Sequence, residues 1–151
     1  MRRKEREIND LKAVESIISS SKVCRLALSD GDQPYIVPLC FGYRDNALYF
    51  HSAVEGKKME IIRKNPNVCF EFEKDVDLIR ADIPCGWGMK YQSVIGFGRA
   101  SVIDETDDKM DAVKIIMSQY SDHEFEFNRD SLNKILIIKV EISEMTGKKS
   151  G

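Results

Sequence analysis

The chain contains few of the residues that build metal centres and disulfide frameworks. Its 151 residues include only two histidines, His51 and His123, and four cysteines, none of which form a C-x₂-C pair. Three of the cysteines lie in apolar, strand-like runs. This favours free buried thiols in a reducing compartment over the alternative of a zinc site. We therefore predict no metal site.

The chain also lacks a large excess of charge and a long apolar run. Its net charge is −2 and its pI is about 5.8, so nothing favours nucleic acid or an anionic membrane as a partner. No apolar run approaches the roughly 18 residues that a membrane-spanning helix needs. The basic opening "MRRKER" lacks the apolar region of a signal peptide. We expect a cytoplasmic protein that binds neither nucleic acid nor a membrane.

Common catalytic motifs are missing as well. The sequence has no G-x-S-x-G, no H-E-x-x-H and no P-loop, and its many carboxylates form no convincing catalytic pair. Gly96-Phe97-Gly98 begins like a dinucleotide-binding motif, but Ser101 replaces the third glycine and the segment lies inside a predicted strand. The single tryptophan, Trp87, could cover a pocket mouth, although a core position is the simpler prediction.

Hydrophobic periodicity predicts six strands and three helices. We expect the strands at 22–28, 34–43, 47–52, 67–74, 89–104 and 134–142. The helices are expected at about 10–20, at about 56–65 and from 104–106 onward. An irregular loop is predicted for 75–86. The third helix shows an apolar stripe of Met110, Val113, Ile116 and Met117.

These elements predict a single domain over residues 1–151 that is mainly β with flanking helices, an α+β class. Six strands are too few for a two-sheet sandwich plus a second domain. Because closing the sheet removes exposed edges, we expect a small antiparallel barrel. The ends, 1–7 and 144–151, are predicted to be loose.

Two lysines occupy an unexpected place on the second helix. Lys57 and Lys58 follow Gly56 in its first turn, where each opposes the helix dipole by about 0.3–1 kcal/mol. A phosphate would reverse the sign of that penalty, because free backbone N–H groups and two ammonium groups make an anion site. Ser52, just upstream, can add a hydroxyl. The alternative is two solvated surface lysines.

A proline marks the second predicted strand. Pro38 cannot donate to a strand ladder, so it indicates an edge or a bulge. Backbone groups near Val37, Leu39 and Cys40 are then free to face a ligand. The local alternative is an ordinary edge strand facing water.

Three stretches together are similar to one known superfamily. "PYIVPLCFGY", "LYFHSAVEGKKMEIIRKNPNVCFEF" and "YQSVIGFGRASVI" occur in one order, with strand, helix and strand spacing. They resemble the FMN-binding split-barrel superfamily, and within it the pyridoxamine 5′-phosphate oxidase-related branch that includes nitroimidazole-resistance proteins. The likeness covers about residues 1–120. It implies a six-stranded antiparallel split β-barrel and a homodimer with one FMN in each of two clefts between subunits.

The resemblance also implies roles for individual residues. Lys57 and Lys58 correspond to the basic pair that grips the FMN phosphate, and Ser52 and Ser93 are expected to help. The small side chain of Ala53 allows close approach of the cofactor.

The same resemblance places other residues near the isoalloxazine ring. The strand through Val37, Pro38, Leu39 and Cys40 would pass beside it. His51 corresponds to a histidine close to the flavin in the resistance proteins and is a candidate proton donor or substrate contact. Gln92 stands where the branch often carries a charged residue.

We therefore predict an FMN-binding flavoprotein, an oxidoreductase that reduces small electron-poor substrates. The substrate-binding residues of pyridoxamine phosphate oxidases are not recognisable at the C-terminal end, so that substrate is not expected. Three alternatives share the motifs: a non-catalytic FMN-binding or electron-carrier protein, a haem-binding barrel of the same fold, and a ligand-free structural dimer. A filled small barrel leaves little internal room, which favours a cleft between subunits.

Overall fold

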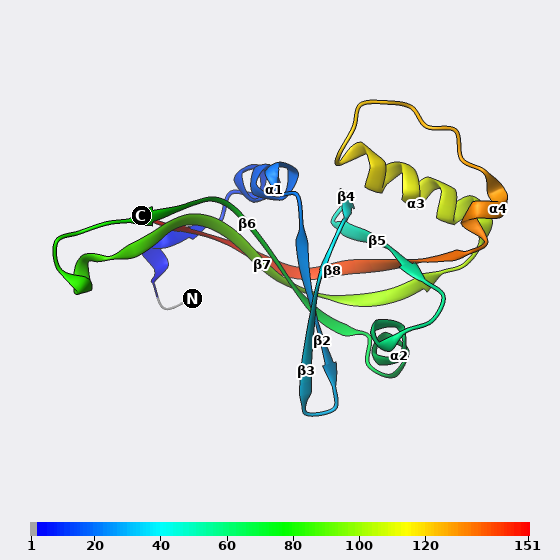
Figure 1. Cartoon of the computed structure of the whole chain (residues 1–151), viewed down its shortest axis with the longest axis horizontal. Helices are drawn as coiled ribbons and strands as arrows, with labels where there is room; N and C mark the ends of the chain where they lie inside the picture. The colour runs from blue at the N-terminus through cyan, green and yellow to red at the C-terminus, as the bar shows by residue number, and fades with distance from the viewer. Residues whose placement is uncertain (1–2) are drawn as a thin grey trace.

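The computed structural model describes residues 3–151 and contains one large antiparallel sheet with helices beside it (Figure 1). The strands are β1 (Glu7–Ile8), β2 (Cys24–Asp30), β3 (Gln33–Leu39), β4 (Gly42–Arg44), β5 (Ala47–Ala53), β6 (Asn67–Ile79), β7 (Gly88–Ile103) and β8 (Ile135–Ser150). The α-helices are α1 (Leu11–Ser20), α2 (Lys57–Lys64), α3 (Thr106–Ser118) and α4 (Arg129–Leu132). Two short 3₁₀ turns, η1 (Lys4–Arg6) and η2 (Pro84–Gly86), complete the chain.

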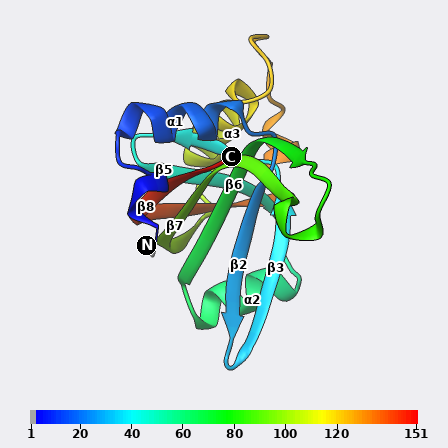
Figure 2. The same ribbon diagram turned by 90° about the vertical axis from the view of Figure 1, so that its left-hand side faces the viewer.

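The strands follow the order β3-β2-β6-β7-β8-β5-β4, and β1 pairs with β8. Every pairing is antiparallel. The turned view in Figure 2 shows the sheet curving, with α1 and α2 at opposite ends of its strands. The predicted class, antiparallel β with flanking helices arranged as a split barrel, is confirmed. The sheet has eight strands rather than six, because the two-residue β1 was not predicted and the predicted strand 34–43 is divided into β3 and β4.

The core lies on the inner face of the curved sheet. Alternation along β6 buries Val68, Phe70 and Phe72, as their spacing predicts. On the opposite face of β6, Glu71 and Glu73 pair with Arg25 at 3.2 and 2.9 Å. These strand faces are therefore sorted as the sequence pattern indicates.

The N-terminal helix, α1, packs against this core. The side chain of Asp10 caps α1 by accepting a hydrogen bond from the amide of Ala13 at 3.0 Å. Val14, Ile17 and Ile18 are fully buried against the sheet. These three residues form the buried face of α1, while Leu11 in its first turn is 56% exposed.

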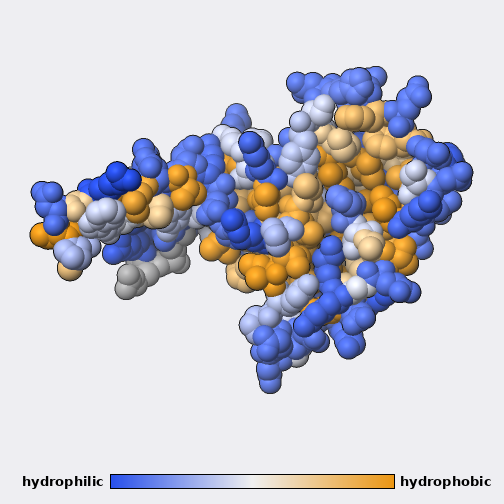
Figure 3. Space-filling model, viewed as in Figure 1, coloured by the Kyte–Doolittle hydropathy of each residue, from blue (hydrophilic) through white to orange (hydrophobic). Residues whose placement is uncertain are grey.

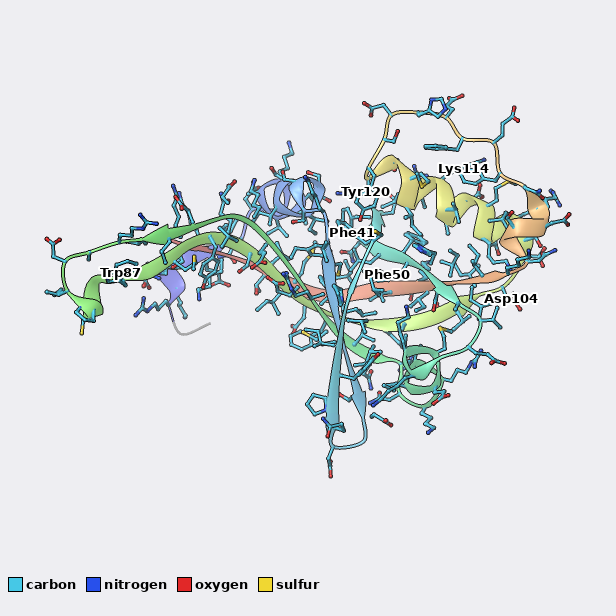
Figure 4. All side chains as sticks on the ribbon, in the orientation of Figure 1. Phe41, Phe50, Trp87, Asp104, Lys114 and Tyr120 are labelled. Atoms are coloured by element: carbon cyan, nitrogen blue, oxygen red, sulfur yellow. The ribbon has the colours of Figure 1, made fainter. Side chains whose placement is uncertain are left out.

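The segment predicted as an irregular loop is instead part of a long β arm. β6 continues to Ile79 and pairs with β7, with a register shift between Lys74 and Asp77. Figure 1 shows this arm extending away from the body, with η2 at its tip. The prediction of an irregular loop is wrong for residues 75–79, because cross-strand pairing, and not local periodicity, keeps this segment extended. Residues 80–86, which include η2, lie outside the strands as predicted. Trp87, predicted as core, is 49% exposed at the arm's tip, so that prediction is also wrong (Figure 4).

The C-terminal tail is ordered in the sheet. β8 runs to Ser150, and its end pairs with β7 on one side and with β1 on the other. The prediction that 144–151 is loose is therefore wrong, because partners distant in sequence supply its ladder. At the other end, Lys4–Arg6 forms a turn and Glu7 pairs with Lys148. The first two residues of the predicted loose segment 1–7 lie outside the described residues.

The buried face of α3 differs from the predicted stripe. Ile116 is buried as expected, but the other buried positions are Lys109, Ala112 and Ile115, while Met110 is only half-buried. The ammonium group of Lys109 is buried with its hydrogen bonds satisfied, which a search for apolar spacing does not detect. Among the described residues, no helix combines the length and the apolarity needed to cross a membrane.

Candidate functional site

A pocket lies where β3, the end of β5 and the first turn of α2 meet. Its volume is about 350 Å³. The lining residues come from three short stretches of sequence: Tyr35, Val37, Pro38, Leu39, Ser52, Ala53, Glu55, Gly56, Lys57, Lys58 and Met59. The structure thus brings together seven of the residues predicted to bind a cofactor: Val37, Pro38, Leu39, Ser52, Ala53, Lys57 and Lys58.

The first turn of α2 presents unpaired backbone donors at this pocket. The first intrahelical hydrogen bond runs from the amide of Glu60 to the carbonyl of Gly56, at 3.1 Å. No side chain caps the helix, so the amides of residues 57–59 have no acceptor within it. Gly56 adopts a φ of 129°, a conformation that L-residues rarely adopt, and a Cβ there would meet no atom within 4 Å. The backbone is therefore open at a site of positive potential.

The two lysines add positive charge to that turn. Among residues 3–151, neither Lys57 nor Lys58 has a carboxylate within ion-pair distance. The ammonium of Lys57 lies 5.0 Å from the ring centroid of Tyr35, a cation–π contact. Lys58 is half-buried, and desolvation lowers the pKa of its ammonium group below 10.5. Glu55 is the only acidic residue lining the pocket. An anion would supply the counter-charge that the lysines lack.

One wall of the pocket is an edge strand. β3 ends the strand order and pairs only with β2, where Pro38 lies opposite Arg25. This position explains why proline is tolerated, since the side of β3 away from β2 needs no donor. The prediction of an edge at Pro38 is confirmed. The free side of β3 leaves backbone groups available to a ligand.

Four of the predicted residues do not line this pocket. Cys40 is exposed in the link between β3 and β4. Gln92 lies on the arm side of β7, where its side-chain amide donates to Asp75 at 2.9 Å. Ser93 is buried on β7 opposite Glu73 and Lys148. In this chain Ser93 is thus separated from the lysine pair, and its predicted role with the phosphate stays a prediction.

His51 is the fourth of these residues. It is exposed, and it lies on the opposite face of β5 from the buried Ser52. Its ladder partner is Ile137 on β8. His51 therefore lies outside the lining of this pocket, and its catalytic role stays a prediction.

Sequence reasoning missed several residues of the site. Tyr35 lies on the same face of β3 as Val37 and Leu39, so strict alternation could have identified it. Met59 and the backbone of Gly56 follow from the helix start. Tyr120 does not line the pocket, and no local pattern indicates that it contacts Phe41, beyond the end of β3, from the far end of α3 (Figure 4).

Comparison with known proteins gives relatives with the same fold. A putative 5-nitroimidazole antibiotic resistance protein from Bacteroides thetaiotaomicron superposes with a TM-score of 0.85 at 33% identity, covering 95% of this chain and 86% of that one. The flavocytochrome Anf3 from Azotobacter vinelandii gives 0.87 at 15% identity, covering 100% and 72%. The FAD and heme binding protein from Mycobacterium smegmatis gives 0.86 at 15%, covering 96% and 73%. At these lower identities the likeness shows the fold alone.

Sequence comparison points to one family. An uncharacterized protein of Rhizobium meliloti (strain 1021) is 35% identical over 57 residues, a segment that spans 38% of this chain and only 37% of that protein. The family model described as pyridoxamine 5′-phosphate oxidase matches residues 10–149, which include the whole pocket and most of the sheet. The chain therefore belongs to the pyridoxamine 5′-phosphate oxidase family.

Proposed function

We propose that this protein is an FMN-binding flavoprotein whose cofactor phosphate is held at the start of α2. One observation carries the proposal: Lys57 and Lys58 line a pocket with free helix amides, and no carboxylate of the described residues pairs with either lysine. The terminal phosphate of FMN is a monoester that carries a charge of about −1.5 to −2 at neutral pH. A doubly basic helix start suits that group better than the two singly charged phosphates inside FAD.

Titration with two flavins tests the phosphate assignment. The dissociation constant of FMN can be measured from the quenching of its fluorescence. It should rise by roughly 10- to 150-fold in Lys58→Ala, because a hydrogen bond to a charged group contributes ~1.5–3 kcal/mol. Lys64→Ala, in the last turn of the same helix and outside the pocket, is the matched control and should bind as the wild type does. Riboflavin, which lacks the phosphate, should bind both variants equally. Equal FMN affinity of Lys58→Ala and wild type would refute the assignment.

We further propose that a second copy of the chain completes the site. The pocket volume, about 350 Å³, is at the low end for small-ligand sites, so one chain encloses only part of a flavin nucleotide. An apolar row also crosses four strands of the outer face in register: Ile36, Ala27, Cys69 and Phe97. Ile36 and Phe97 are 61% and 48% exposed. Pro38 shares the face of Ile36 and lines the pocket, so the row is continuous with it.

Charge placed in the row tests the dimer. Phe97→Glu should shift the protein from dimer to monomer in sedimentation, because burying an unpaired carboxylate in the interface is costly. The same substitution should weaken FMN binding, because the second copy completes the site. Phe125→Glu, which alters an exposed aromatic residue on the loop after α3, is the control. Wild-type protein that sediments as a monomer with FMN bound would overturn this arrangement.

The reaction that we propose is electron transfer from reduced flavin to a small electron-poor substrate. The flavin supplies the redox chemistry. The chain binds the phosphate of the flavin, orients the flavin ring along β3 and excludes water from it. The name of the 33%-identical relative supports this substrate class, since a 5-nitroimidazole is an electron-poor ring. Anaerobically reduced protein mixed with a 5-nitroimidazole should reoxidise faster than the nitro compound reacts with free reduced FMN.

The same experiments separate the alternatives. An electron carrier would hold FMN but show no accelerated reoxidation by the nitro compound. Two neighbours of similar fold are named as a flavocytochrome and a heme-binding protein, so haem is the second cofactor to test. The visible spectrum of purified protein should show flavin bands. A Soret band without flavin absorbance would contradict the proposal.

A further inference from the structure

A tyrosine hydroxyl bridges the two backbones where the β2–β3 ladder ends. Cys24 is paired with Leu39, so continuing the register by two residues sets Lys22 opposite Phe41. At this point the amide of Phe41 donates to the Tyr120 hydroxyl at 3.0 Å, and that hydroxyl donates to the carbonyl of Lys22 at 2.9 Å. The hydroxyl thus stands between a donor and an acceptor that an uninterrupted ladder would bring together.

The end of α3 holds this hydroxyl in place. The side-chain amide of Gln119 donates to the carbonyls of Ser19 and Ser21 at 3.0 Å each, which ties α3 to the end of α1. The ring of Tyr120 packs edge-on against Phe41, with centroids 6.3 Å apart (Figure 4). Burial raises the pKa of Tyr120 to about 12, so its hydroxyl remains a donor at neutral pH. The bridge is therefore a fixed part of the fold.

The bridge acts on the strand that lines the pocket. Leu39, two residues before Phe41, lines it with Val37 and Pro38. Because β3 is an edge strand, no further strand fixes its outer side. Beyond Leu39 the backbone is held by the hydrogen bond to Tyr120, by the fully buried ring of Phe41 against Phe72, and by the pairing of β4 with β5. Loss of the hydroxyl would let the two backbones close together or separate, and either movement would shift the pocket wall.

We propose that Tyr120 is a positioning residue for the cofactor site, which sets the backbone of residues 39–41 through its bridge between Phe41 and Lys22. This inference rests on the proposed function, because it assigns Tyr120 to the flavin pocket. Tyr120 itself does not line that pocket. It acts through the backbone of β3 and makes no contact with the flavin.

The test removes one oxygen atom. Tyr120→Phe should bind FMN about five- to tenfold more weakly and should shift the flavin absorption bands. In the apo protein, the amide of Phe41 should exchange with solvent hydrogen faster than in the wild type. Tyr43→Phe is the matched control, since its hydroxyl also donates a hydrogen bond, to Glu15 at 3.0 Å, but outside the pocket. The control should bind FMN as the wild type does.

The outcomes separate the two levels of inference. If the wild type binds FMN and the dissociation constant of Tyr120→Phe is within twofold of the wild-type value, the positioning role is overturned. The proposed function is then left intact. If Tyr120 only stabilised the fold, Tyr120→Phe and Tyr43→Phe would both have a lower urea midpoint of unfolding. The FMN dissociation constant of the folded protein would then not change. If Tyr43→Phe loses as much FMN affinity as Tyr120→Phe, the inference also fails. A wild type that binds no flavin refutes the proposed function itself, and exchange at Phe41 then reports only on the bridge.

Discussion

A close approach between α3 and the sheet occurs at Gly42, and it gives a sharp test of the fold around the site. Gly42 lies in β4, and a Cβ built on it would be 2.7 Å from the backbone of Ile115 and Ile116 in α3. Backbone atoms cannot rotate away, so Gly42→Ala must push α3 from the sheet. Overpacking of this kind costs about 1–3 kcal/mol. For a chain of this length we expect the melting temperature to fall by roughly 2–4 °C for each kcal/mol.

A matched substitution isolates the clash. Gly88→Ala adds the same methyl group to another strand, where the nearest atom is 3.8 Å away, an ordinary contact. Both changes remove similar backbone entropy from the unfolded chain, an effect of about 0.4–1 kcal/mol in the stabilising direction. The difference between their free energies of unfolding, measured with urea on the apo protein, therefore reports the packing of α3 on β4. Equal stability of the two variants would show that this close approach does not exist.

Three further predictions use other contacts. Asp10→Ala should lower the free energy of unfolding by about 1 kcal/mol through loss of the α1 cap, whereas Asn9→Ala should not; equal effects in urea titrations would contradict the cap. Lys109→Met should cost about 1–3 kcal/mol, because it leaves a buried carbonyl without its donor, while Lys114→Met on the exposed face should be nearly neutral. Burial lowers the pKa of Lys58 in the free protein, and a bound phosphate would raise it, so FMN binding should take up protons at pH values near that lowered pKa. The FMN affinity should then fall as the pH rises through that lowered pKa, and Lys58→Ala should abolish this fall; a parallel fall in the variant would exclude Lys58 as its source.

The sequence by itself determined the local elements of the site. The predicted helix at 56–65 is observed as Lys57–Lys64, with the lysine pair in its first turn. The proline in β3 correctly indicated an edge, and the alternation of β6 gave its buried face. Caps, dipoles and side-chain periodicity act over a few residues, so their signals are complete within a short stretch of sequence.

Only the tertiary structure decided which distant segments meet. Residues 75–79 of the arm and the tail at 144–150 look irregular in sequence, yet both are strands because β7 pairs with each of these segments. Strand pairing, and the contact of Tyr120 with a backbone 79 residues away, depend on which partner the folded chain supplies. Contacts between residues distant in sequence produce no periodic pattern near either residue. The folded structure was therefore needed to connect Tyr120 with the pocket.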